Sequence, residues 1–314
     1  MRETFLKNFK IFLKYLVKTL YFFSVIKYNT YALTLYCDKV NEKNYFLGET
    51  IMKKLLTLVL TLCFALTACM GLAGCGKTIT VGYTDYPPMN YTDDNGKLVG
   101  FDTELAQKVF KELGYKIRFK EIDWNNKYSE LNGGTIDCIW NGFTANCADS
   151  DGIERSSKVD FTYNYMTNAQ CVIRLASSTE LTDATQFAGN SVAYEQGSAG
   201  ETYASELTGA NLKAVGSQMT AIMEVKAGTS QYAVVDLLLA RSIAGQGDYA
   251  NIVINEGIVI DAEYYAIGFK IGSELTAQVN SLLVKYAADG SLAALAQKYG
   301  LSNQIILDYS DQIA

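Results

Sequence analysis

The chain has 314 residues, of which 49% are apolar and 19% charged, and this is sufficient for two globular domains. It contains no histidine, which excludes Ser-His-Asp and Cys-His catalysis as well as metal sites built on histidine. No run of lysine and arginine indicates a nucleic-acid partner, and we expect neither a metal nor a cofactor.

The net charge of −6 is distributed unevenly. Residues 1–75 carry 10 Lys+Arg and 4 Asp+Glu, a net charge of +6. Residues 76–314 carry 17 and 29, a net charge of −12, so the two parts account for the whole. A basic, apolar leader before an acidic body is typical of an exported protein.

Residues 1–51 have an unusual composition, because Lys, Asn, Tyr and Phe supply 23 of the 51. Lys10, Lys14 and Lys18 interrupt the only apolar run, which makes it a poor membrane span, although a basic amphipathic helix is an alternative. We interpret this segment as AT-rich upstream DNA read through from a start codon assigned too early, with synthesis beginning at Met52.

A second leader follows in residues 52–74. Met52-Lys53-Lys54 is a charged n-region, and residues 55–67 form an apolar h-region shorter than the roughly 20 residues that a membrane span needs. Leu72-Ala73-Gly74-Cys75 resembles the bacterial lipobox. This predicts cleavage before Cys75, acylation of that residue, a lipidated N-terminus at 75–77 and anchoring to the outer face of the cytoplasmic membrane. The alternative is an ordinary transmembrane anchor.

Three cysteines follow Cys75, namely Cys138, Cys147 and Cys171, and three cannot all pair. Cys138 and Cys171 lie in apolar, strand-like runs, where a free cysteine behaves as a small hydrophobe. A Cys138–Cys147 bridge stays open, because spacing alone does not establish a disulfide.

The rest of the chain alternates strands with helices, which predicts an α/β fold. A turn is expected at Asp94-Asn95-Gly96, and Asp102 is expected to cap the helix that Gly114 ends. The predicted strands are Thr78–Tyr83, Lys116–Ile122, Ile136–Trp140, Cys171–Leu175, Ser191–Tyr194, Tyr232–Val235, Ile252–Ile254 and Tyr264–Phe269. The predicted helices are Phe101–Leu113, Glu201–Leu207, Met219–Ala227, Leu237–Ala244, Glu274–Ala288 and Leu292–Tyr299.

The segment from Asp137 to Phe161 carries the strongest chemical pattern. Asn141-Gly142 is expected to end the strand at 136–140, and Gly142 would let a ligand approach the backbone. Thr144 then offers a hydroxyl and an amide, and Arg155 offers a planar fork that suits a carboxylate. The alternative is a strand, a turn and a solvated arginine.

From Thr78 to Gly300 the chain resembles the extracellular solute-binding proteins of polar amino-acid transporters, family 3, which have the periplasmic-binding-protein type II fold. The motifs that carry this resemblance are Asp85-Tyr86-Pro87-Pro88-Met89, Val99-Gly100-Phe101-Asp102, Gly134-Thr135-Ile136-Asp137, Asn141-Gly142-Phe143-Thr144, Glu154-Arg155, Val159-Asp160-Phe161, Gly197-Ser198-Ala199-Gly200, Val234-Val235-Asp236 and Ala288-Asp289-Gly290-Ser291.

The resemblance implies two lobes and a hinge of two chain crossings. Lobe 1 would hold residues 78–165 and 266–314, and lobe 2 would hold residues 169–262. The crossings would fall near Tyr165–Ala169 and Asp261–Tyr265. A ligand in the cleft would drive hinge closure by touching both lobes.

The resemblance also assigns roles to residues. Arg155 and Thr144 would bind the α-carboxylate of an amino acid, together with the amides of Ser198 and Ala199. Asp236 would bind the α-ammonium group, assisted by the carbonyl of Asn141.

Three further positions would shape the pocket. Tyr86 and Trp124 would form aromatic walls around the ligand, and Gly142 would be a steric requirement. Trp140 is expected to be packing rather than ligand contact.

Each role has an alternative. Asp236 and Ser198 could be simple helix caps, and Tyr86 and Trp124 could belong to the core. The loop at residues 146–152 is longer than in the family, which bears on the geometry of Arg155.

The function that the resemblance implies is extracytoplasmic binding of a free amino acid and its delivery to the permease of an ABC importer, by a monomer that is not an enzyme. The alternative is a cyclohexadienyl or arogenate dehydratase on the same fold. The side chain of the ligand stays open, because net charge steers association without defining a pocket.

Overall fold

The computed structural model describes residues 77–258, 260 and 262–313. The chain divides into two units after Cys75, and all described residues belong to the second, Gly76–Ala314. The predicted upstream extension, signal peptide and lipidated Cys75 therefore lie outside the described residues. Among the residues that are described, no helix is long and apolar enough to cross a membrane.

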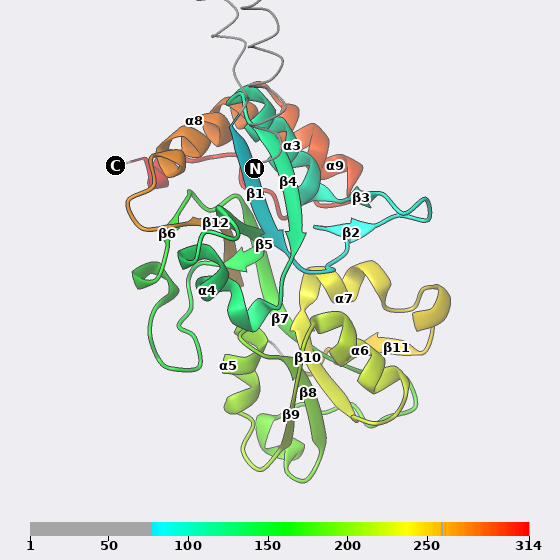
Figure 1. Ribbon diagram of the computed structural model, residues 1–314. Helices are drawn as coiled ribbons and strands as arrows, with labels where there is room; N and C mark the ends of the chain where they lie inside the picture. Colours follow the sequence, from blue (N-terminus) through cyan, green and yellow to red (C-terminus); the bar gives the residue numbers. More distant parts are fainter. Residues whose placement is uncertain (1–76, 259, 261, 314) are drawn as a thin grey trace, which may run out of the picture. The chain divides into compact units, whose positions relative to one another are not determined.

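Ten strands of the second unit form one mixed sheet in the order β4-β1-β5-β12-β7-β10-β8-β9, with β6 beside β12 and β11 beside β7 (Figure 1). We define the first strand group as β1 (Thr78–Tyr83), β4 (Lys116–Glu121), β5 (Cys138–Thr144), β6 (Asp160–Phe161) and β12 (Ala262–Phe269). The second strand group is β8 (Ser191–Glu195), β9 (Asn211–Val215), β10 (Tyr232–Asp236) and β11 (Ile252–Ile254).

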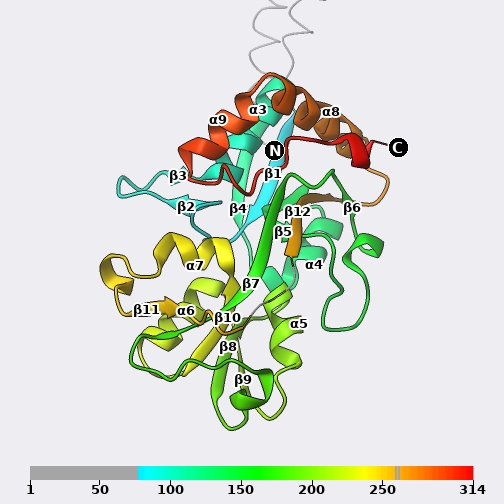
Figure 2. The ribbon, with the colours of Figure 1, turned by 180° about the vertical axis from the view of Figure 1, so that it is seen from behind.

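Strand β7 (Met166–Leu175) joins the two groups (Figure 2). Its first residues pair antiparallel with β12, from Ala169 opposite Ala262 to Met166 opposite Tyr265. Its later residues pair with β10 and β11. The two segments expected to cross between lobes therefore run side by side as a two-stranded connection.

Helices accompany each group. The first strand group packs with α3 (Phe101–Glu112), α4 (Lys127–Asn132), α8 (Glu274–Ala288) and α9 (Ser291–Lys298), and the second with α5 (Ala199–Ser205), α6 (Gln218–Lys226) and α7 (Leu237–Ile243) (Figure 1). Short 3-10 turns lie at Trp124–Asn126, Arg155–Ser157, Ala184–Phe187, Gly247–Tyr249 and Ser310–Gln312. The predicted α/β order is confirmed, and Thr78–Tyr83, Ile252–Ile254 and Glu274–Ala288 have the predicted bounds.

Some short elements were not predicted. Strand β9 has four exposed side chains among its five residues, so it lacks the alternation that marks a half-buried strand. Strands β2 (Tyr91–Thr92) and β3 (Leu98–Val99) form a short hairpin around the predicted turn. Helix α4 has only six residues, too few for a periodic pattern.

Two local predictions are wrong. Asn141-Gly142 does not end the strand, because β5 continues to Thr144 with Gly142 at a φ of 56° inside it. The β12 pairing shifts register between Ala266 and Gly268 and accommodates this irregularity. Asp102 does not cap its helix; Gly100 is the N-cap residue, and the buried Asp102 carboxylate accepts the Gly142 amide at 2.8 Å instead.

The core confirms the packing role of Trp140, which is fully buried with its ring edge-on to Phe110. Cys138, Cys147 and Cys171 are free thiols. The open possibility of a Cys138–Cys147 bridge is therefore excluded in this structure.

Candidate functional site

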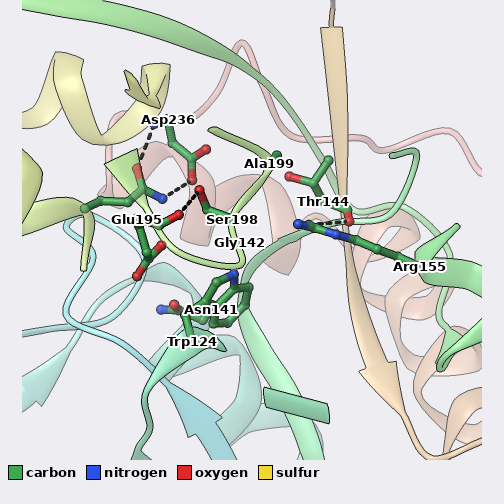
Figure 3. Close-up of a pocket in the computed structure, with 10 residues that line it drawn as sticks. Trp124, Asn141, Gly142, Thr144, Arg155, Glu195, Ser198, Ala199 and Asp236 are labelled. Atoms are coloured by element: carbon green, nitrogen blue, oxygen red, sulfur yellow. Dashed lines mark hydrogen bonds between the residues drawn. The ribbon is translucent and has the colours of Figure 1, made fainter. Parts of the chain in front are cut away.

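A cavity opens where the ends of β5, β8 and β10 meet the 3-10 turn at Trp124 (Figure 3). Its lining contains eight of the nine predicted site residues together with two residues that the sequence did not single out. The lining residues are Trp124, Asn141, Gly142, Thr144, Arg155, Glu195, Ser198, Ala199, Gln218 and Asp236. Segments separated by more than a hundred residues thus converge on one place, as the resemblance implied.

Arg155 is a buried cation in this lining, with 1% of its surface exposed. Its Nη1 donates to the Thr144 carbonyl at 3.1 Å and its Nη2 to the Gly197 carbonyl at 3.3 Å. Its Nε donates to Asp149 Oδ1 at 2.8 Å. The alternative of a solvated arginine is therefore wrong.

Asp149 comes from the long loop that bore on the placement of Arg155. Its second oxygen accepts from Lys158 Nζ at 2.8 Å and from the Tyr128 hydroxyl at 2.7 Å. Burial disfavours the charged form of Asp149, but Arg155 and Lys158 outweigh burial and lower its pKa to about 2. The loop thus holds the arginine by its inner nitrogen, and the outer nitrogens face the cavity.

Asp236 is a buried anion on the other side of the same cavity. Its Oδ2 accepts from Gln218 Nε2 at 2.8 Å, and Gln218 Oε1 accepts the Asp236 amide at 2.7 Å. Gln170 Nε2 donates to Oδ1. Burial raises the pKa of Asp236, with the two glutamines opposing it. Asp236 occupies the N-cap position of α7, but its side chain makes no capping bond, so the simple-cap alternative is wrong.

Ser198 is a helix cap as well as a lining residue. Its hydroxyl accepts the Glu201 amide at 3.2 Å and donates to the Glu195 carbonyl at 2.7 Å. Its own amide donates to the same carbonyl at 3.2 Å. Ala199 is the first residue of α5, where an amide has no acceptor within the helix.

Trp124 and Tyr86 were expected to form the two aromatic walls, and the structure separates them. Trp124 lines the cavity and packs edge-on against Phe143. Tyr86 is not in the lining; it is 2% exposed, and its hydroxyl lies 2.6 Å from that of Tyr265. A Cβ on Gly142 would lie 2.7 Å from Tyr86 Cε1, so the Tyr86 ring fills the space beside the glycine.

Asn141 and Thr144 direct their side chains into the protein. The Asn141 amide bonds to the Thr84 carbonyl at 2.9 Å and to Asn90 Oδ1 at 2.8 Å. The Thr144 hydroxyl donates to Glu263 Oε2 at 3.3 Å. These bonds fix the end of β5, which leaves backbone groups as the parts of β5 that can meet a ligand.

The sequence did not predict the acidic and amide side chains that lie near Arg155 and Asp236. Glu195 and Gln218 line the cavity, and Glu263 lies behind it, where burial raises its pKa to about 7. One signal was present: Glu195 and Asp236 end neighbouring parallel strands, and ligands of open α/β sheets bind at the carboxyl ends of strands. Gln218 offered none, because its contact with Asp236 depends on tertiary packing.

Four hydrogen bonds cross the cavity or its rim between the helices and loops of the two strand groups. Two converge on the Gly197 carbonyl, from Arg155 and from Lys127 Nζ at 2.7 Å. The others run from Thr202 to the Ala148 carbonyl at 3.2 Å and from Ser242 to the Pro87 carbonyl at 3.0 Å. The cavity volume is about 10 Å³, close to that of one water molecule, so entry of any larger ligand requires the two sides to separate.

In the part of the chain that the structure describes, no group of three or more Cys, Asp or Glu side chains is placed to hold a metal ion. The cavity lining presents a buried guanidinium, buried carboxylates and amides. This set suits a small zwitterion.

Comparisons with known proteins agree with this chemistry. The family model of the bacterial extracellular solute-binding proteins, family 3, matches residues 79–302. An arginine-binding extracellular protein of Bacillus subtilis is 28% identical over 79% of this chain and 98% of its own length. An L-cystine-binding protein of Escherichia coli is 26% identical over 71% of this chain and 82% of its own. The solved structure of an ancestral amino acid-binding protein, a precursor of cyclohexadienyl dehydratase, aligns with a TM-score of 0.63 at 27% identity, over 71% of this chain and 95% of that one.

Proposed function

Because the chain belongs to the bacterial extracellular solute-binding proteins of family 3 and has the two-lobe type II fold, we propose that it binds an amino acid and delivers it to an ABC importer. The observation that carries this proposal is the pair of buried opposite charges, Arg155 and Asp236, in one cavity lining. A zwitterion is the small molecule that satisfies both charges at once.

The α-carboxylate would lie against Arg155, whose Nη2 would exchange the Gly197 carbonyl for a charged acceptor. The α-ammonium would lie against Asp236. Arg155 lies between β5 and β6 of the first strand group and Asp236 ends a strand of the second, so one ligand would hold both sides together. In this proposal lobe 1 is residues 78–165 and 266–314, lobe 2 is residues 169–262, and the β7–β12 connection is the hinge.

Names of relatives support an amino acid without deciding its side chain, since one is named for arginine and another for cystine. The dehydratase alternative draws support from the ancestral neighbour and from the buried acid Glu195 in the lining. The paired Arg155 and Asp236 disfavour prephenate as a ligand, because prephenate carries no ammonium group for Asp236. Arogenate carries one, so a test of turnover has to separate binding from reaction.

The family places the protein outside the cytoplasm. A lipid anchor at Cys75 belongs to the proposal and rests on the lipobox-like Leu72-Ala73-Gly74-Cys75. Changing Cys75→Ser should release the protein from membranes or leave its precursor uncleaved. A variant that stays processed and membrane-bound would end the lipoprotein assignment.

Mass spectrometry of small molecules extracted from the purified protein tests the function. We expect a free amino acid at near one equivalent per chain, and no turnover of added prephenate or arogenate. If the protein converted either compound and Glu195→Gln abolished the conversion, the dehydratase assignment would replace that of a binding protein.

A further inference from the structure

Glu195 is the one acidic side chain of the cavity lining that has no role in the proposed binding of the α-carboxylate and the α-ammonium. It ends β8, it is 2% exposed, and it lies in the lining with Trp124 and Asp236. In the view of Figure 3 its carboxylate points away from Asp236, toward the side of the cavity where Trp124 and Asn141 lie.

The Glu195 carboxylate is incompletely paired. Its Oε1 is buried and has no hydrogen-bond partner among the described residues. No described ion pair joins Glu195 to a lysine or arginine. A buried carboxylate oxygen without a donor is strongly unfavourable, because nothing replaces the water that it loses.

Lys127, the cation whose charge acts on Glu195, is engaged elsewhere. Its Nζ donates to the Gly197 carbonyl at 2.7 Å and to the Trp124 carbonyl at 3.4 Å, and it lies 4.6 Å from the centre of the Tyr128 ring. Burial and Asp236 disfavour a charge on Glu195, while Lys127 and the side chain and backbone of Gln218 favour it. None of these groups donates a hydrogen bond to Oε1.

The two α-groups of a bound amino acid leave the Glu195 carboxylate without a partner of opposite charge. The α-carboxylate matches Arg155 and the α-ammonium matches Asp236. A ligand with an aliphatic side chain would leave Glu195 Oε1 buried and unpaired beside a second carboxylate. A ligand with a cation at the end of its side chain supplies the donor and the opposite charge, in a cavity that Trp124 also lines.

We propose, on the premise that the protein binds an amino acid as above, that Glu195 receives a positively charged group at the end of the ligand's side chain. The ligand class is then an amino acid with a guanidinium or ammonium side chain. Glu195 is the residue that selects this class against neutral isosteres.

Titration calorimetry with L-arginine, L-lysine and L-citrulline tests this proposal, because citrulline keeps the shape of arginine without its charge. Wild-type protein should bind arginine or lysine at least 100-fold more tightly than citrulline. Glu195→Gln should weaken binding of the preferred cation at least 30-fold and leave citrulline within threefold. Glu206→Gln, an exposed glutamate of the same lobe, should leave all three within threefold.

Two results would overturn the assignment of Glu195. One is wild-type protein that binds citrulline or L-glutamine as tightly as arginine and lysine. The other is a Glu195→Gln variant that weakens charged and neutral ligands equally, which indicates a structural role. If a neutral amino acid binds and needs Arg155, only this inference fails; if no amino acid binds, the proposed function fails with it. Should Glu195→Gln not fold, the wild-type preference alone decides.

Discussion

Single residues at the cavity could be predicted from the sequence where they belong to a family motif. They could not be predicted where their role depends on tertiary packing. Arg155 follows from a motif that precedes β6 and Asp236 from a motif at the end of β10, and both lie in the lining. Tyr86 also belongs to a motif, yet it packs behind Gly142. Glu195 and Gln218 belong to no motif. Glu195 matters because its Oε1 has no hydrogen-bond partner, and Gln218 because it bonds to Asp236 of another element, and neither fact can be deduced from sequence.

Buried acids make the stability of the unliganded protein depend on pH. Burial raises the pKa of Asp102 to about 7 and that of Glu195 to about 8, well above the values of exposed carboxyl groups. Burial likewise raises the pKa of Glu263 to about 7. The folded state therefore binds more protons than the unfolded state between about pH 4.5 and pH 7.

We predict that the unfolding free energy of the unliganded protein falls as the pH rises from 5 to 7. Lys127, whose pKa burial lowers to about 7, acts in the opposite direction only above that pH, and Asp149 acts only below about pH 4. Urea denaturation at pH 5, 6 and 7 should show a loss of at least about 1 kcal/mol, since one proton corresponds to about 1.4 kcal/mol per pH unit. A constant or rising unfolding free energy would mean that these acids are hydrated rather than buried.

At the scale of the element, periodic strands and helices were predictable and irregular ones were not. Strand β1 and helix α8 have clear periodicity and their predicted bounds. Strand β5 was shortened in the prediction, because a glycine after an asparagine normally marks a turn. The structure keeps it extended by pairing it with β12 across a register shift.

The long loop at residues 146–152 shows how an unusual length can support a site. In the sequence, the loop is longer than in the family, and this put the geometry of Arg155 in question. In the structure its Asp149 carboxylate orients the guanidinium, and its Ala148 carbonyl meets Thr202 of α5. This contact between distant segments could not be deduced from loop length.

Gly142→Ala should destabilise the protein by about 1–3 kcal/mol, because alanine disfavours a φ of 56° and its Cβ would lie 2.7 Å from the buried Tyr86 ring. Gly216→Ala is the matched control, since a Cβ there meets no atom within 4 Å and the φ lies outside the left-handed region. Urea denaturation compares the two variants. Equal stability of both would show that β5 is not constrained at Gly142.

At the scale of the whole second unit, the two strand groups are joined by a pair of strands and by a few polar contacts. Two of those contacts reach the Gly197 carbonyl from charged donors, each worth roughly 1.5–3 kcal/mol, and the neutral bond to the Pro87 carbonyl is worth roughly 1 kcal/mol. They can break without disturbing either core. A ligand that binds both sides can therefore shift the balance between separated and closed forms.

Asp236→Asn removes a charge from one side of the cavity and keeps the size of the side chain. We predict at least 30-fold weaker amino-acid binding and a larger radius of gyration at a fixed ligand concentration that saturates the wild type. The unfolding free energy without ligand should stay within about 1 kcal/mol, because the charge that is removed also disfavours the charged forms of Glu195 and Glu263, which offsets the loss of one hydrogen bond. If small-angle scattering showed full compaction of the variant and its affinity were unchanged, Asp236 would not bind the α-ammonium group.

The central claim is that Arg155 binds the α-carboxylate of an amino acid, and a cycle of four calorimetric titrations tests it most directly. The wild type and Arg155→Ala are each titrated with the amino acid extracted from the protein and with its α-carboxamide, and Arg118→Ala, an exposed arginine, is the control. We predict that Arg155→Ala lowers affinity for the amino acid more than 100-fold, consistent with about 3–5 kcal/mol for a broken buried ion pair, and for the carboxamide less than tenfold. Equal losses for both ligands, or an affinity of Arg155→Ala for the amino acid within threefold of the wild type, would contradict the account.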